Sequence, residues 1–119
     1  MWKILQTNQF SEWFTSSDNV DEDARVSIYA VMGVLKSMGP NLGRPYVDSV
    51  NGSRHENMKE LRVQSKGRPF RIFFVFDPFR QAVLLIGGNK TGDKRFYTRM
   101  IPIADTLYDQ YLQDLGARK

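Results

Sequence analysis

Residues 84–97, LLIGGNKTGDKRFY, are the stretch of this chain with the strongest chemical character. An apolar run ends at Gly87-Gly88, and the side chains that follow within nine residues include Lys90, Lys94, Arg95 and Tyr97. Glycines at the end of a strand let the backbone approach a ligand closely. Lysine and arginine bind phosphate oxygens, and a tyrosine adds a stacking surface or a hydroxyl proton. We therefore expect the functional site at this loop.

Charge is unevenly distributed along the sequence. Residues 54–100 carry 11 basic and 4 acidic side chains, whereas residues 1–53 carry 4 and 6 and residues 101–119 carry 2 and 3. The formal net charge of +4 therefore arises in the middle of the chain. A basic face on an otherwise near-neutral domain is typical of nucleic-acid binding. The alternative is a solvated basic surface without a partner, because clustering in sequence does not guarantee clustering in space.

Length and composition restrict the class of protein. A chain of 119 residues predicts one domain, residues 1–119, that can bury a core without disulfides. The sequence has no cysteine and a single histidine, His55, so disulfides, thiolate zinc sites and cysteine nucleophiles are excluded and we expect no metal or other cofactor. The N-terminal segment MWKILQTNQF has no long apolar core, and no run approaches about 18 apolar residues. We expect a cytoplasmic protein without a signal peptide, a membrane span or a membrane partner.

The first 40 residues predict one strand and two helices. Residues 2–7 are a candidate strand and residues 8–15 a short helix. Residues 20–38 give the clearest helical pattern, with apolar side chains at positions i, i+4, i+7, i+8 and i+11 counted from Ala24. Asp18 or Asn19 is a suitable N-cap, and Gly39-Pro40 is expected to end the helix.

Three strands and a last helix are predicted in the remainder. The strands are residues 58–64, 70–77 and 81–87, with turn residues at 77–80 between the last two. Pro102 is the expected first residue of a helix that continues to about residue 115. This order predicts an α+β fold, namely a four-stranded, mainly antiparallel sheet with two N-terminal helices and one C-terminal helix packed against it.

Alternation within residues 58–64 assigns the side chains of this strand to two faces. Glu60 and Arg62 share one face, and Lys59 lies with two apolar residues on the other. An arginine is costly to bury alone, so we expect Arg62 to face a groove rather than the core. Arg71, in the next strand, is expected either to pair with Arg62 across the sheet surface or to form a salt bridge with Glu60.

Three motifs together, KELR, PFRI and GGNKTGDKRFY, resemble the RelE/ParE superfamily of toxin–antitoxin toxins, and most closely its HigB-type, phage-derived branch. The resemblance covers roughly residues 42–115, and any one of the motifs alone would be weak. It implies a RelE-like, microbial-RNase-type fold and a metal-independent endoribonuclease, an mRNA interferase that cuts mRNA on the translating ribosome. It also implies a cognate antitoxin, usually a small helix-turn-helix protein encoded next to the toxin.

An RNase of this kind needs a base for the ribose 2′-hydroxyl, cations for the phosphorane and an acid for the leaving 5′-oxygen. The resemblance assigns phosphorane stabilisation to Arg62 and Lys90, and it assigns to Tyr97 the orientation or deprotonation of the 2′-hydroxyl or the stacking of a base. His55, as a base or acid, and Lys59 complete the expected catalytic set. Contacts to RNA or the ribosome are expected from Arg54, Arg71, Lys94 and Arg95.

Several of these assignments have alternatives. Glu60 is a candidate general base if it faces the groove, and the family often adds a C-terminal basic residue, for which Arg118 and Lys119 are not assignable. His55 could instead be a loop histidine that caps a backbone group, and Tyr97 could be an aromatic lid over the edge of the core.

Two functions of other classes compete with the ribonuclease. One is a ParE-like toxin that inhibits DNA gyrase by binding it without hydrolysis. The other is a phage protein that binds nucleic acid without enzymatic activity. A groove that contains Arg62, Lys90 and Tyr97 argues against the ParE-like alternative, whereas the binding protein requires only a basic surface.

Overall fold

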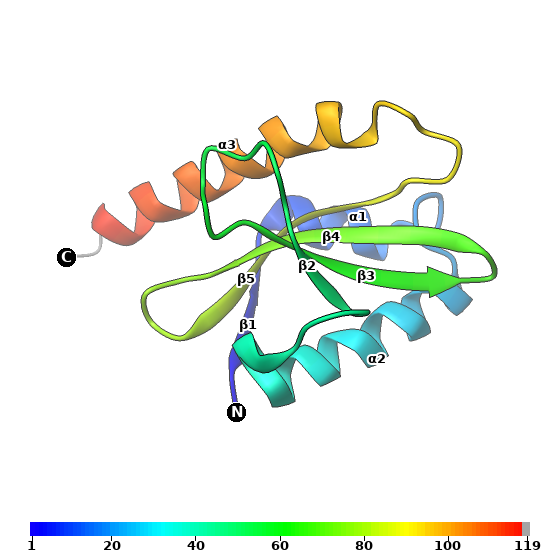
Figure 1. Ribbon diagram of the computed structural model, residues 1–119, viewed down its shortest axis with the longest axis horizontal. Helices are drawn as coiled ribbons and strands as arrows, with labels where there is room; N and C mark the ends of the chain where they lie inside the picture. The colour runs from blue at the N-terminus through cyan, green and yellow to red at the C-terminus, as the bar shows by residue number, and fades with distance from the viewer. Residues whose placement is uncertain (118–119) are drawn as a thin grey trace.

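A five-stranded mixed sheet with helices on both faces organises residues 1–117, the part of the chain described by this computed structural model (Figure 1). In chain order the elements are β1 (Lys3–Gln6), α1 (Asn8–Thr15), α2 (Glu22–Met38), the 3-10 turn η1 (Gly39–Asn41), β2 (Val47–Ser49), β3 (Lys59–Ser65), β4 (Arg68–Phe76), β5 (Gln81–Asn89) and α3 (Phe96–Ala117). The strand order is β1-β5-β4-β3-β2. β1 runs parallel to β5, and the other neighbouring strands are antiparallel.

The predicted α+β class is confirmed, but the predicted count of four strands is wrong. The additional strand is β2, which is three residues long and pairs with β3 at the edge of the sheet. It lies in a stretch rich in glycine, proline and asparagine, and three residues are too few to show the alternation that identifies a strand. The predicted terminal basic residues Arg118 and Lys119 lie outside the described part of the chain.

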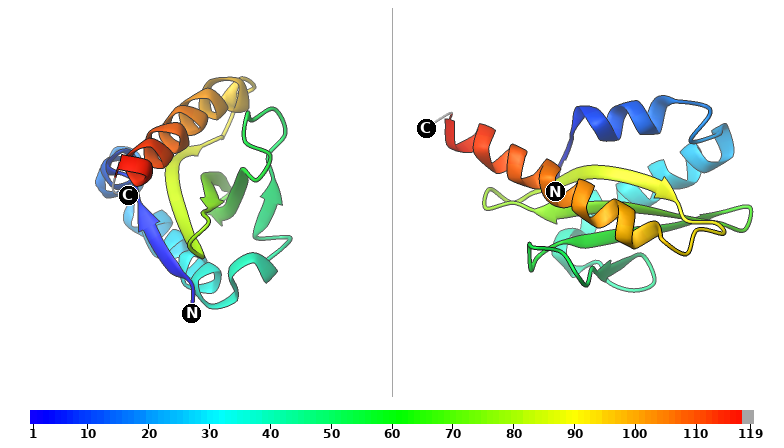
Figure 2. Two further views of the ribbon diagram at one scale, coloured as in Figure 1. Left: turned by 90° about the vertical axis from the view of Figure 1, so that its left-hand side faces the viewer. Right: turned by 90° about the horizontal axis from the view of Figure 1, so that it is seen from above.

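Two hydrophobic clusters lie on the two sides of the sheet, one under α1 and α2 and the other under α3. Figure 2 shows the backbone of these helices and of the sheet from two further directions. β4 shows the division clearly, because Phe70, Ile72 and Phe74 pack under α1 and α2 whereas Phe73 and Val75 pack under α3. Side chains of a strand point alternately to its two faces, and both faces of this strand are covered by helices. This double coverage explains the nearly continuous apolar run that marks β4 in the sequence.

The last helix begins earlier than Pro102 predicted. α3 starts at Phe96, and Pro102 lies exposed inside it, so the reading of proline as the first helical residue is wrong. Asp93 precedes the first turn, accepts a hydrogen bond from the Arg95 backbone N–H, and pairs with Arg99 at 2.7 Å. The Arg99 guanidinium holds the pKa of Asp93 below its ordinary value. The early start places residues 96 and 97 on a rigid element instead of in a loop.

The glycine pair at the end of β5 makes room for aromatic rings and not for a ligand, which corrects the expectation drawn from the sequence. A Cβ on Gly87 would lie 2.4 Å from the Trp13 ring, and one on Gly88 would lie 2.7 Å from the Phe96 ring. Both rings fit because these positions have no side chain. Gly88 in particular lets the first turn of α3 approach the sheet.

Replacement of Gly88 by alanine should therefore destabilise the domain. The added methyl group meets Phe96, which is fully buried, and overpacking of this kind costs about 1–3 kcal/mol. Gly33→Ala is the matched control, because Gly33 is exposed within α2 and no neighbouring atom lies within 4 Å of the added Cβ. The free energy of unfolding of the control should rise by about 0.5–1 kcal/mol, because alanine has a higher helix propensity than glycine. Urea unfolding of both variants measures the difference, and equal stability of the two would contradict the packing account.

Candidate active site

Glu60 is the centre of a polar cluster on the α3 face of the sheet. Its side chain comes from β3 and is almost fully buried. One carboxylate oxygen accepts a hydrogen bond of 2.7 Å from the Tyr97 hydroxyl, which comes from the first turn of α3. The Nε atoms of Arg62 and Arg71 lie 3.8 and 3.9 Å from the two carboxylate oxygens, distances typical of ion pairs rather than of hydrogen bonds.

The two arginines are direct neighbours across β3 and β4. Sequence analysis left open whether Arg71 pairs with Arg62 or with Glu60, and the structure contains both arrangements. Arg62 is partly exposed, with 34% of its side-chain surface accessible, whereas the side chain of Arg71 is 6% accessible. The predicted exposure of Arg62 to a groove therefore agrees with the structure, and Arg71 lies beneath it.

Arg71 is incompletely compensated. One guanidinium nitrogen donates to the Phe70 carbonyl oxygen at 3.0 Å, but Nε has no hydrogen-bond partner among residues 1–117. Two guanidinium groups share a single carboxylate, so this part of the surface carries an excess positive charge. A buried donor without a partner is energetically unfavourable, and a nearby anion would balance the excess charge.

Tyr97 connects this group to the basic loop. Its ring packs edge-on against Phe73 and Phe96, and the Lys90 ammonium lies 5.1 Å from the ring centroid. Burial raises the pKa of Tyr97, and the hydrogen bond to Glu60 raises it further, against the opposing effect of Arg71. Tyr97 is therefore a protonated hydrogen-bond donor at neutral pH. We use the name Glu60 cluster for Glu60, Arg62, Arg71, Lys90 and Tyr97.

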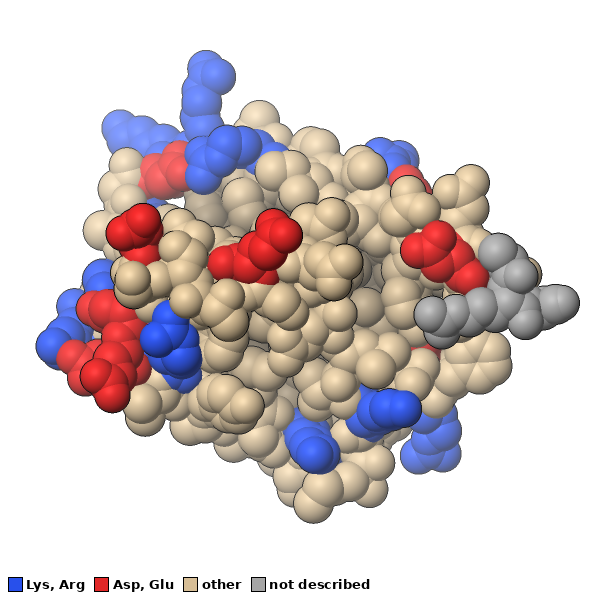
Figure 3. Space-filling view, turned by 180° about the vertical axis from the view of Figure 1, so that it is seen from behind, with Lys and Arg blue, Asp and Glu red and all other residues tan. Residues whose placement is uncertain are grey.

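The loop between β5 and α3 carries the remaining cations near the cluster. Its path is fixed by a bond from the Lys90 backbone N–H to the Pro69 carbonyl and by two bonds from Thr91 to the Asn89 side chain. Lys94 and Arg95 are exposed. Figure 3 shows lysine and arginine side chains grouped at the corner of the molecule where this loop lies, on a surface of otherwise mixed charge.

The structure does not bring His55 into the cluster. Its ring nitrogen lies 2.7 Å from an Asp109 oxygen, its ring packs edge-on against Tyr108, and the hydrogen bond from His55 holds the pKa of Asp109 below its ordinary value. Asp109 follows Tyr97 by twelve residues, which is about 18 Å along a helix. In this arrangement His55 attaches its loop to the middle of α3.

Arg54 and Lys59 have different surroundings. Arg54 forms ion pairs with Asp105 and Asp109, and it lines a shallow hollow that Tyr97 also lines. It therefore lies close enough to the Glu60 cluster to contact a ligand that extends along α3. Lys59 belongs to the face of β3 opposite Glu60, so the structure separates it from the other candidates.

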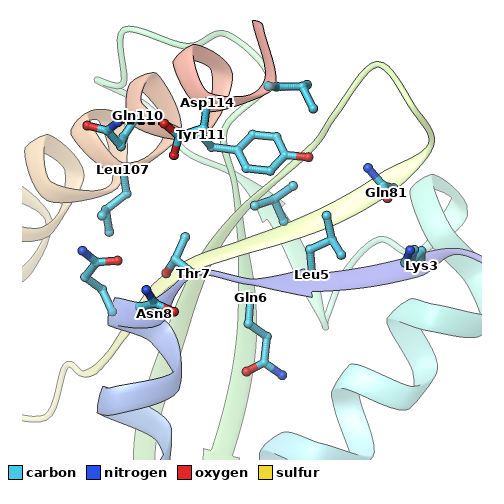
Figure 4. A pocket seen from close by; sticks show the side chains of 13 residues that line it. Lys3, Leu5, Gln6, Thr7, Asn8, Gln81, Leu107, Gln110, Tyr111 and Asp114 are labelled. Atoms are coloured by element: carbon cyan, nitrogen blue, oxygen red, sulfur yellow. Dashed lines mark hydrogen bonds between the residues drawn. The ribbon is translucent and has the colours of Figure 1, made fainter. Parts of the chain in front are cut away.

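A second hollow, of about 590 Å³, lies between β1, β5 and the C-terminal half of α3 (Figure 4). Leu5, Leu107 and Tyr111 line it, and Lys3 is its one cation among the described residues. It shares no lining residue with the Glu60 cluster. We therefore do not place the active site there.

Comparisons with known proteins show the family to which the chain belongs. Residues 16–109 match the family described as phage-derived protein Gp49-like. The chain belongs to this family. It is 47% identical over 110 residues to a Mycobacterium tuberculosis protein named "Putative toxin HigB3", with 92% of each chain covered. It is 43% identical over 106 residues to "Putative toxin HigB2" of the same organism, covering 87% of this chain and 51% of that protein.

The family match confirms the resemblance to the HigB-type, phage-derived branch that the three motifs indicated. The Gp49-like match covers every member of the Glu60 cluster. Within residues 1–117, the acidic and histidine side chains form no group of three or more that could hold a metal ion. In the same part of the chain, no helix has the length and apolar character required to cross a membrane.

The hydrogen bond between Tyr97 and Glu60 can be tested by titration. Glu60→Gln removes the negative charge that helps to keep Tyr97 protonated, so the pKa of Tyr97 should fall while the contribution from burial remains. The pKa is measured from the ultraviolet absorbance of tyrosinate, as the difference between each protein and the same protein with Tyr97→Phe. Asp109→Asn is the control and should leave the titration of Tyr97 unchanged. An unchanged pKa in Glu60→Gln would mean that the bond is not formed in solution.

Proposed function

We propose that this protein is the toxin of a type II toxin–antitoxin system and that it inhibits translation as a ribosome-dependent mRNA endoribonuclease. Membership of the Gp49-like family and similarity to proteins named as HigB toxins support the toxin assignment. The observation that carries the ribonuclease assignment is the Glu60 cluster, since it combines three cations with a hydrogen-bonded tyrosine on a partly open surface.

Arg62 is assigned to the phosphorane. In this reaction the ribose 2′-oxygen bonds to the neighbouring phosphorus while the bond from phosphorus to the 5′-oxygen breaks, and negative charge accumulates on the non-bridging oxygens. Arg62 is the accessible guanidinium of the pair, so its side chain can reach those oxygens. Arg71 lies beneath it and adds positive charge at a fixed position, and Lys90 approaches from the loop on the other side of Tyr97.

Tyr97 and Glu60 are assigned to the first proton transfer. A tyrosine with a raised pKa is a poor base alone, but its proton already points to a carboxylate. The 2′-hydroxyl proton moves to the Tyr97 oxygen while the Tyr97 proton moves to Glu60, so no free phenolate forms. The leaving 5′-oxygen takes a proton from the Lys90 ammonium. Exchange with solvent then removes the proton gained by Glu60 and returns the one lost by Lys90.

A cognate antitoxin is the expected protein partner. We expect it to supply a segment that docks over the Glu60 cluster or on the exposed surface of α2 or α3, two helices that cover opposite faces of the sheet. Either position is consistent with the basic charge and exposed helix surface of this chain. A complex that leaves both surfaces fully exposed would contradict this assignment.

Expression in a bacterial host tests the enzymatic function. The wild-type protein should arrest growth, and primer extension on messages from the arrested cells should show discrete internal ends. Arg62→Ala should abolish the arrest while the protein stays folded, because loss of one transition-state donor lowers a rate by about 100- to 1000-fold. Lys36→Ala is the control, since it removes the same charge from the exposed side of α2.

Three other outcomes would contradict the proposal. If Arg62→Ala arrests growth as strongly as the wild type, Arg62 does not have the role assigned to it. Growth arrest with intact messages and altered DNA supercoiling would favour the gyrase inhibitor. If the protein causes neither growth arrest nor cleavage of messages, it is a nucleic-acid-binding protein without activity.

A further inference from the structure

A hollow of about 450 Å³ lies at the edge of β3, next to the Glu60 cluster. It exists because β2 covers only part of β3. The backbone pairing extends from Ser49 to Val47 and ends with the bond from the Arg62 N–H to the Tyr46 carbonyl oxygen. Before residue 46 the chain leads back toward α2, so the end of β3 is paired with β4 on one side and has no strand on the other (Figure 1). We call this space the Tyr46 hollow.

Its lining combines apolar and cationic parts. Val31 from α2, Pro45, Tyr46 and Val63 supply apolar surface. Tyr46 is 41% exposed, so much of its side chain is available for contact. Planar, apolar surface of this kind is what the face of an aromatic ring stacks against.

The cationic part consists of the two arginines of the Glu60 cluster. Arg62 and Arg71 both line the Tyr46 hollow and both lie within 4 Å of Glu60. The hollow and the cluster therefore share a wall. Arg71 is more than nine-tenths buried, and its Nε lacks a hydrogen-bond partner in residues 1–117. A ligand with an anionic group at this wall would balance the excess positive charge of the two arginines.

We propose that the Tyr46 hollow is a nucleobase subsite, which binds the base of a nucleotide next to the scissile phosphate. The base stacks on Tyr46 and contacts Val31 and Pro45, while the phosphate of the same nucleotide lies against Arg62 and Arg71. This inference rests on the proposed ribonuclease function and adds a position at which the enzyme holds its substrate. A nucleotide fits better than a purely apolar ligand, because such a ligand would leave the arginine wall uncompensated.

The direct test is binding of a tetranucleotide with 2′-deoxy sugars, which keeps the bases and phosphates but cannot undergo 2′-hydroxyl attack. Titration followed by NMR should shift the backbone signals of Tyr46, Val31 and Gln64, which all line the hollow, and it should leave those of Tyr29 unchanged. Tyr46→Ala should weaken binding by about 5- to 100-fold, the range expected for loss of one stacked base. Tyr46→Phe keeps the ring and should stay within about twofold of the wild type.

Two controls define the position. Tyr29→Ala removes another exposed tyrosine, on the outer side of α2, and should not change the affinity. A set of probes, each with one abasic position, should contain one member that binds the wild type as weakly as the complete probe binds Tyr46→Ala. The affinity of that probe should be the same for the wild type and for Tyr46→Ala, because the missing base and the missing ring remove the same contact.

Equal affinity of the wild type and Tyr46→Ala for the complete probe would overturn the subsite, as would absence of any shift at Tyr46, Val31 and Gln64. If Tyr46→Ala instead weakened only the complex with the antitoxin, the hollow would be a protein-docking site. Failure of the subsite alone leaves wild-type cleavage of ribosome-bound mRNA intact. If the proposed function is wrong, the wild-type protein does not cleave ribosome-bound mRNA, so the two results are distinguishable.

Discussion

The carboxylate of Glu60 is almost fully buried between two arginines and a tyrosine, and the arrangement of the proposed site depends on it. It keeps two guanidinium groups side by side on neighbouring strands, where their mutual repulsion would otherwise separate them. It also fixes the hydroxyl of Tyr97 as a donor that points into the sheet. Removal of the buried partner Arg71 would be strongly unfavourable, whereas Arg62 is partly exposed and Glu60 keeps Arg71 and Tyr97 without it.

The position of α3 determines whether Tyr97 can reach that carboxylate. Phe96 fits into the space left by Gly88, and Asp93 holds the start of the helix through Arg99 and the Arg95 backbone. Farther along the helix, Asp109 attaches the loop that carries His55. The start and the middle of α3 are thus both held in place, and Lys90 of the preceding loop lies against the Tyr97 ring.

Sequence reasoning recovered the parts that depend on local pattern. The helix at 8–15, most of α2, the three long strands and the common face of Glu60 and Arg62 all follow from periodicity and turn residues. The errors arose where tertiary contacts outweigh local preference. Pro102 is tolerated inside α3, and the three residues of β2 form a strand only because β3 offers them an edge.

The residue types of the candidate site could be predicted from the sequence, but which of these residues lie together in space could not. The motif residues Arg62, Lys90 and Tyr97 converge, yet no local signal separates them from His55, which the structure places elsewhere. The separation of Lys59 follows from strand alternation alone, and a stricter use of that rule would have found it. The central place of Glu60 depends on contacts among β3, β4 and α3, and the Tyr46 hollow depends on contacts of α2 and residues 45–46 with β3 and β4. Only a three-dimensional structure provides these contacts.

Attack by the ribose 2′-hydroxyl on the neighbouring phosphate is the step that the proposed mechanism assigns to the Glu60 cluster. The most direct test supplies ribosomes programmed with a message that carries a single 2′-deoxy sugar at the mapped cleavage site, beside an otherwise identical all-ribose message. Our account predicts that the purified protein cuts the all-ribose message to leave a 2′,3′-cyclic phosphate and leaves the 2′-deoxy message intact at that site. Cleavage of both messages at equal rates would show that the 2′-hydroxyl is not the nucleophile and would contradict the account.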